Sequence, residues 1–278
     1  MRDRPGAASS QRRILVLGGT TQAREIAQQL TLNTGLRLWY ALAGRTRQPH
    51  TDGIPAHSVI SGSLGGTDGL ARFLRERRVD ALIDATHPFA QNISRNALEA
   101  ARREAVPLAR FERAPWAQLA DDNWHFVAST EAAIRFLLQT EPALCYRNVL
   151  LTIGAAELPV WCEALGTSTQ DGGPEKPTVF ARSIEAPACE MPANFTNIRA
   201  RGPFTLAAES ELLSARRIDL IISKLSGGSS GYAKVLAARQ HGIPMLMIEP
   251  PALPATLGFD TVADMVRWAT KPTPRTAT

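Results

Sequence analysis

Residues 14–27 read ILVLGGTTQAREIA, and this stretch decides the fold class. Four apolar residues at 14–17 predict a buried strand, Gly18 and Gly19 predict a tight turn, and residues 22–30 have helical spacing. This order brings backbone N–H groups and the positive end of a helix to one point, which suits a phosphate. The full G-x-G-x-x-G pattern is missing, so two interpretations stay open: a nucleotide site, or only a tight strand-to-helix turn.

The same strand-and-helix order recurs along the chain. Further strands are predicted at residues 36–44, 57–66, 80–85, 106–111, 125–129, 148–154, 178–184, 219–224 and 244–248. Helices are predicted at residues 67–78, 91–104, 205–216 and 232–241, and another opens at Ser129. Continuous apolar strands separated by helices are typical of parallel sheets covered on both faces. We therefore predict an α/β fold of two Rossmann-like lobes with mostly parallel sheets and an intervening cleft, at residues 13–120 and 121–270.

Composition narrows the class of protein. The chain has 278 residues, is 44% hydrophobic and carries a net charge of +5, which favours an anionic partner. Its basic residues are scattered without interleaved aromatics, so no nucleic-acid partner is expected. Cys145, Cys162 and Cys189 are widely spaced, which predicts neither a disulfide framework nor a metal site. The N-terminus lacks the apolar core of a signal peptide and no run could span a membrane, so we expect a cytoplasmic protein.

Three more strand exits in the first half carry candidate ligand contacts. Arg45 follows the second strand, where an arginine suits the extra phosphate of NADP, although a solvated loop arginine fits equally well. Gly65 and Gly66 follow the third strand and let the backbone approach a ligand. His87 follows the fourth strand, near Asp84, as a catalyst, a ligand clamp or a structural histidine.

A second glycine-rich segment, SKLSGGSSGYAK at residues 223–234, follows a predicted strand in the second half. It resembles an anion cradle, and a flexible linker is the alternative. The P-loop spacing is absent, so ATP hydrolysis is not indicated. The candidate contacts of this segment are Lys224, Ser226, Gly227, Gly228 and Lys234.

Arginines near the predicted boundary and in the second half are the remaining candidates. Arg110, Arg113 and Arg201 are either ordinary surface charges or anchors for a ligand with several carboxylates. Trp116 would then offer that ligand a flat apolar contact.

Taken together, these stretches resemble the precorrin-6A reductase family of cobalamin biosynthesis, which includes cobalt-precorrin-6A reductases. The matching segments, in the family's order, are LGGTTQAREIA, AGRT, DATHPFAQNISRNA, RFERAPW, GPFT…E and SKLSGGSSGYAKVLAARQHGIPMLMI. Leu225, where a polar residue is expected, and Glu249, where a basic one is frequent, depart from the family's pattern.

The resemblance implies an NADPH-dependent oxidoreductase that reduces a ring double bond of precorrin-6A, with the reaction between a cofactor lobe and a tetrapyrrole lobe. It also implies that final strands are exchanged between the lobes. The cofactor contacts would be Gly18, Gly19, Thr20, Thr21, Arg45, Gly65, Gly66 and His87. The substrate contacts would be Arg110, Arg113, Arg201, Lys224, Ser226, Gly227, Gly228 and Lys234. His87 and Lys224 are the candidate proton donors, with solvent or a substrate carboxylate as the alternative. No metal is implied, and a monomer and the metal-free substrate are expected.

Two other classes of function remain open. A sugar-nucleotide transferase is also built from two Rossmann-like lobes, and it would bind a nucleoside diphosphate without oxidising NADPH. A non-catalytic tetrapyrrole carrier would bind the macrocycle without turnover.

Overall fold

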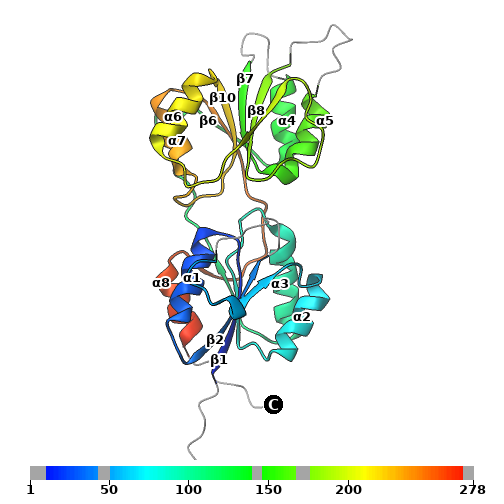
Figure 1. Cartoon of the computed structure of the whole chain (residues 1–278), viewed down its shortest axis with the longest axis vertical. Helices are drawn as coiled ribbons and strands as arrows, with labels where there is room; N and C mark the ends of the chain where they lie inside the picture. The colour runs from blue at the N-terminus through cyan, green and yellow to red at the C-terminus, as the bar shows by residue number, and fades with distance from the viewer. Residues whose placement is uncertain (1–10, 43–50, 140–145, 167–175, 272–278) are drawn as a thin grey trace, which may run out of the picture. The chain divides into compact units, whose positions relative to one another are not determined.

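The computed structural model describes residues 11–42, 51–139, 146–166 and 176–271. The chain forms two compact units, Met1–Glu112 with Ala252–Thr278, and Arg113–Pro251. Each unit contains a sheet of six parallel strands with helices on both faces (Figure 1). The predicted α/β class with parallel sheets is confirmed. In the described part of the chain, no helix is long and apolar enough to cross a membrane.

The first sheet has the strand order β12-β5-β4-β1-β2-β3. Its strands are β1 (Arg12–Leu17), β2 (Leu36–Leu42), β3 (Val59–Ser61), β4 (Ala81–Asp84), β5 (Leu108–Phe111) and β12 (Leu257–Phe259). The short helix η1 (Ala56–Ser58) precedes β3. Because all neighbouring pairs are parallel, the segments after β1, β3 and β4 lie at one edge of the sheet.

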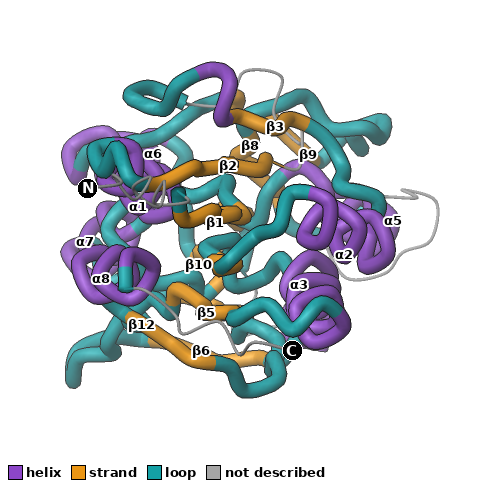
Figure 2. The backbone as a smooth tube through the Cα atoms, turned by 90° about the horizontal axis from the view of Figure 1, so that it is seen from below, coloured by secondary structure: helices purple, strands orange, loops and turns teal. Residues whose placement is uncertain are grey.

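Four helices cover the first sheet, two on each face. Helices α1 (Thr21–Thr31) and α8 (Val262–Thr270) lie together on one face, and α2 (Gly66–Glu76) and α3 (Gln91–Arg103) on the other (Figure 2). Each pair buries an apolar layer against the strands. Burial on both faces explains why β1 is a run of apolar residues without polar alternation.

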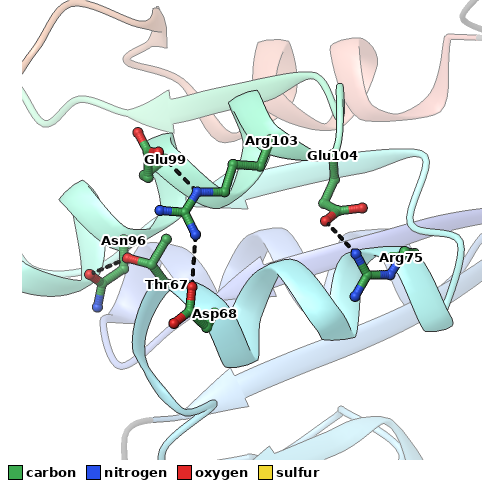
Figure 3. Close-up of polar contacts among 7 residues, drawn as sticks. All are labelled: Thr67, Asp68, Arg75, Asn96, Glu99, Arg103 and Glu104. Atoms are coloured by element: carbon green, nitrogen blue, oxygen red, sulfur yellow. Dashed lines mark hydrogen bonds and ion pairs between the residues drawn. The ribbon is translucent and has the colours of Figure 1, made fainter.

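Polar contacts between α2 and α3 fix the start of α2 (Figure 3). Thr67 donates to the Oδ1 of Asn96 over 3.0 Å, and Arg103 bridges Asp68 and Glu99. These ion pairs are exposed and add little stability. Because Thr67 follows Gly65 and Gly66, its hydrogen bond to Asn96 holds the glycine turn at the start of α2 against α3.

The second sheet has the order β6-β11-β10-β7-β8-β9. Its strands are β6 (Trp124–Val127), β7 (Asn148–Thr152), β8 (Thr178–Ser183), β9 (Phe195–Arg199), β10 (Leu220–Lys224) and β11 (Met245–Ile248). Its helices are α4 (Thr130–Gln139), η3 (Ala155–Glu157), α5 (Leu158–Leu165), α6 (Leu206–Ala215) and α7 (Tyr232–Gln240). Helices α4 and α5 cover one face, and α6 and α7 cover the other (Figure 1).

The end of the chain departs from the predicted division at residues 120 and 121. Strand β12 pairs in parallel with β5, and α8 packs against α1, so both belong to the first unit. Met265 and Ala269 of α8 are completely buried in the core of that unit. The second unit therefore begins at Arg113 and ends at Pro251.

Most predicted elements are present, with ends shifted by a few residues. The helix predicted to open at Ser129 is α4, and the Ser129 hydroxyl accepts from the N–H of Ala132. Four elements were not predicted: β9, β12, α5 and α8. Strands β9 and β12 lack a continuous apolar run, because each lies at an edge of its sheet.

Candidate functional site

The turn after β1 is shaped around the ring of Tyr40 in β2. A Cβ on Gly18 would lie 2.3 Å from the Tyr40 ring, so only glycine fits there. The N–H of Gly19 donates to the Tyr40 hydroxyl over 3.4 Å. Burial raises the pKa of Tyr40, so this hydroxyl stays protonated at neutral pH.

Gly19 and Thr20 prepare the start of α1 for a ligand. Gly19 has a φ of +108°, and no described residue other than its chain neighbours has an atom within 4 Å of the position its Cβ would take. Thr20 caps α1, because its hydroxyl accepts from the N–H of Ala23 and donates to the carbonyl of Ala85. Within the described residues, the N–H groups of Thr21 and Gln22 donate to no protein acceptor. The turn thus combines an open backbone with the positive end of an 11-residue helix.

The turn before α2 has the same openness. Gly65 and Gly66 have φ values of +80° and +65°, a conformation that favours glycine. Beyond the neighbouring residues of the chain, no described atom lies within 4 Å of the Cβ position of Gly66, so the backbone can approach a ligand there. Arg45, the predicted contact for a ribose phosphate, lies outside the described residues.

His87 lies between β4 and α3, at the same edge of the sheet as Gly18 and Thr20. Its Nδ1 accepts from the N–H of Phe89 over 3.3 Å, and its carbonyl accepts from the N–H of Ala90. The ring is partly exposed, with its centroid 5.8 Å from that of Phe89. The backbone after His87 thus forms a tight turn that fixes the imidazole.

Asp84 is near His87 in the sequence, but its described hydrogen bonds go to Thr86 and Arg110. Asp84 is 1% exposed and accepts from the hydroxyl of Thr86 over 2.6 Å. It also pairs with the Nε of Arg110 in β5 over 3.4 Å. Arg110 in turn donates to the carbonyl of Pro254, which lies before β12. Arg110 therefore joins β4, β5 and the returning end of the chain within the first unit.

In the second unit, a glycine turn follows β10 and precedes α7. Gly227 and Gly228 have φ values of +63° and +74°. A Cβ on Gly227 would lie 2.4 Å from the carbonyl oxygen of Ala114, so the turn packs against the start of this unit. Within the described residues, the N–H groups of Gly227, Gly228 and Ser229 donate to no protein acceptor. Such consecutive N–H groups are able to bind an anion.

Arg113 and Trp116 flank this turn in different ways. Burial lowers the pKa of Arg113, and its guanidinium forms no hydrogen bond or ion pair with the residues that the structure describes. Its Cβ is 3.4 Å from the position a Cβ on Gly227 would take. Trp116 is buried and donates to the carbonyl of Gly228 over 2.7 Å. The expectation that Trp116 offers a flat face to a ligand is therefore wrong, because this ring belongs to the core.

Lys224 and Arg201 lie near the carboxyl ends of strands in the second unit. The ammonium of Lys224, at the end of β10, forms an ion pair with Glu157. Arg201 is exposed in the segment between β9 and α6. Ser226 is partly buried, and its N–H donates to the carbonyl of Lys224.

Lys234, predicted as a substrate contact, lies inside the second unit. Its ammonium is 5.1 Å from the centroid of the Trp116 ring. The pKa of Lys234 is lowered to about 7, first by burial and then by Arg182, against the opposing effect of Glu209. Arg182 and Glu209 form a buried ion pair of 2.7 Å. Lys234 therefore belongs to a buried charge cluster and not to an exposed cradle.

Other parts of the described chain give no sign of a second site. Among residues 11–42, 51–139, 146–166 and 176–271, no three His, Cys, Asp or Glu side chains gather as metal ligands. A shallow depression of about 390 Å³ lies at the amino end of β5, lined by residues of α3 and the segment before β5. None of the candidate ligand contacts lines it.

Comparison with known proteins decides the family. The model of the family described as precorrin-6x reductase CbiJ/CobK matches residues 13–270. The chain belongs to this family. The resemblance drawn from the sequence is thereby confirmed, and it favours a reductase over a sugar-nucleotide transferase or a non-catalytic carrier.

Relatives of the precorrin-6x reductase family cover nearly the whole chain. A precorrin-6A reductase from Rhodococcus erythropolis is 40% identical over 92% of this chain and 96% of the relative. A cobalt-precorrin-6A reductase from Salmonella typhimurium is 27% identical over 92% of this chain and 94% of the relative. The solved structure of CobK precorrin-6A reductase superposes with a TM-score of 0.81 at 33% identity, over 96% of this chain and 100% of that one.

Sequence reasoning missed residues whose partners are distant in the chain. Tyr40 shapes the first glycine turn, and Glu157 pairs with Lys224. Arg182 and Glu209 surround Lys234. One signal was available: Arg182 is a charged residue within a predicted apolar strand, and such a residue needs a buried partner.

Proposed function

We propose that the chain is an NADPH-dependent precorrin-6A reductase whose first unit binds the cofactor and whose second unit binds the tetrapyrrole. Family membership over residues 13–270 is the observation that carries this proposal. When bound, NADPH supplies a hydride to one carbon of a ring double bond, and the neighbouring carbon gains a proton.

The first glycine turn fits a dinucleotide pyrophosphate. Gly18 makes room for the Tyr40 ring and Gly19 leaves the backbone open. Thr20 and Thr21 begin the helix, whose first N–H groups have no acceptor among the described residues and would donate to the phosphates. Arg45 would contact the ribose phosphate that distinguishes NADPH from NADH. Other contacts proposed at this edge are Gly65, Gly66 and His87.

The second glycine turn fits a carboxylate of the tetrapyrrole. Among the described residues, the N–H groups of Gly227 and Gly228 have no acceptor and the guanidinium of Arg113 has no partner, which supports this role. Arg201, Lys224 and Ser226 would add polar contacts at the same edge of the sheet. Arg110 and Lys234 would contribute indirectly, because the guanidinium of Arg110 pairs with Asp84 and the ammonium of Lys234 is buried.

Two residues are proposed as proton donors, His87 and Lys224. His87 lies at the cofactor edge of the first unit, and Lys224 ends β10 in the second. The pH dependence of kcat in His87→Asn and Lys224→Met would separate them. Replacing the proton donor should remove from the pH profile of kcat the fall that accompanies its deprotonation. Replacing a residue that only positions the substrate should change KM alone.

The metal-free substrate is proposed over the cobalt complex. Relatives described as precorrin-6A reductases are 31–40% identical to this chain, whereas those described as cobalt-precorrin-6A reductases are 25–27% identical. We also propose a cytoplasmic monomer, which size-exclusion chromatography with light scattering would test.

The decisive assay follows NADPH oxidation at 340 nm with precorrin-6A and weighs the product by mass spectrometry. A gain of two hydrogens in the macrocycle is expected. The proposal fails if neither precorrin-6A nor its cobalt complex supports NADPH oxidation. Turnover of the cobalt complex alone would overturn only the choice of substrate.

A further inference from the structure

Four segments of the second unit meet at one buried ammonium, that of Lys234. Trp116 comes from the start of the unit, Arg182 from β8, Glu209 from α6 and Lys234 from α7. Glu209 is 2% exposed, and its Oε2 has no hydrogen-bond partner among the described residues. The guanidinium of Arg182 also lies 4.0 Å from the ring centroid of Phe204.

Burying this much charge is costly, and a hydrophobic cluster of similar volume would often be as stable. The charged groups that act on the ammonium of Lys234 are Arg182 and Glu209, which already pair with each other. A protonated Lys234 therefore leaves one positive charge in excess in the cluster of Arg182, Glu209 and Lys234. This arrangement favours a role for the ammonium beyond stability.

The ammonium of Lys234 is connected to the glycine turn by the ring of Trp116, which contacts both. It lies over Trp116, whose indole N–H donates to the carbonyl of Gly228 over 2.7 Å. It is also 3.5 Å from the position a Cβ on Gly231 would take. The contact between ammonium and ring is stronger when desolvated, as it is here.

We propose that Lys234 is a positioning residue for tetrapyrrole binding. Its ammonium holds Trp116, Trp116 holds the carbonyl of Gly228, and the N–H groups of Gly227 and Gly228 are thereby aimed at a carboxylate of the substrate. The excess positive charge behind the turn adds attraction for that carboxylate. The inference rests on the proposed function, because it assigns a further residue to the same substrate site.

Lys234→Met tests the inference, since methionine fills a similar volume without the charge. At pH 6.5 the KM for precorrin-6A should rise at least about fivefold, the size of one ordinary hydrogen bond. The kcat and the KM for NADPH should stay within twofold. Trp116→Phe, which keeps a ring but loses the N–H to Gly228, should raise the same KM, and the double variant should be no worse than the more affected single variant.

The pH profile separates positioning from a merely structural role. Because the pKa of Lys234 is about 7, the wild-type KM for precorrin-6A should rise between pH 6 and pH 8.5. Lys234→Met should lack this rise in KM, so the ratio of its KM to the wild-type KM should shrink as the pH rises. Lys176→Met is the matched control, since that ammonium donates to the Gly166 carbonyl in the same unit, and it should match wild type.

Four results would overturn the inference while wild type still turns over precorrin-6A. They are an unchanged KM in Lys234→Met, a loss confined to kcat, a KM ratio independent of pH, or an unchanged KM in Trp116→Phe. Absence of wild-type turnover on either substrate would instead refute the proposed function. Should Lys234→Met fail to fold, Trp116→Phe and the wild-type pH profile decide the matter.

Discussion

Replacing Gly18 by alanine should destabilise the first unit through a single contact with Tyr40. The new Cβ would lie 2.3 Å from one ring carbon, 2.5 Å from Cζ and 2.6 Å from the hydroxyl oxygen. Ordinary contact between carbon atoms is about 3.5 Å, so the ring would have to move by about 1 Å. Tyr40 is 1% exposed and packed within the core, so it has little room to move. Overpacking of this kind costs about 1–3 kcal/mol.

A double-mutant cycle isolates that contact. Tyr40→Leu alone should also cost stability, because it leaves a cavity in the core. In the double variant the shorter leucine leaves space for the alanine methyl, so its loss should be smaller than the summed losses by about 1–3 kcal/mol. Urea unfolding of the four proteins, followed by circular dichroism, measures the coupling. Gly35→Ala is the control, since its Cβ would meet only the exposed Asn33 side chain, at 3.3 Å.

Additive losses, within about 0.5 kcal/mol, would refute this account of the turn. NADPH binding provides a second readout, because the N–H of Gly19 donates to the Tyr40 hydroxyl. Gly18→Ala should weaken NADPH binding in fluorescence titrations. An unchanged affinity would remove the first glycine turn from the proposed cofactor site.

Three further predictions concern charged residues. Arg45→Ala should raise the KM for NADPH about tenfold or more, which corresponds to the loss of one charge-assisted hydrogen bond, and should leave the KM for NADH unchanged. Equal effects on the two KM values would show that Arg45 does not contact the ribose phosphate. Arg110→Met should lower the unfolding free energy by about 3–5 kcal/mol, because Asp84 keeps a buried charge without its partner. A normal stability with a raised KM for the tetrapyrrole would instead identify Arg110 as a direct anchor. The unfolding free energy of wild type should rise relative to that of Lys234→Met between pH 7 and pH 10. In this range the unfolded chain binds a proton at Lys234 that the folded chain releases. A difference in unfolding free energy that stays constant with pH in urea titrations would contradict the burial of this ammonium.

Local patterns in the sequence determined the architecture of both units. Residues 14–27 predict β1, the glycine turn and α1, because apolar runs, glycine pairs and helical spacing are properties of neighbouring residues. The same patterns give the two glycine turns that follow parallel strands. They also carry the family resemblance, since the matching segments lie at the strand exits.

The family resemblance implies that final strands are exchanged between the lobes, but only the tertiary structure decided which strand the last one pairs with and which charges are buried. Strand β12 is three residues long and largely exposed, so no apolar run in the sequence predicts its pairing with β5. The sequence placed Arg110 and Lys234 among the substrate contacts because both are basic. Whether such a charge faces water or pairs inside the protein depends on Asp84, Glu209 and other partners that are 25 or more residues away in the chain. Spacing along the sequence does not record those distances, because the fold creates them.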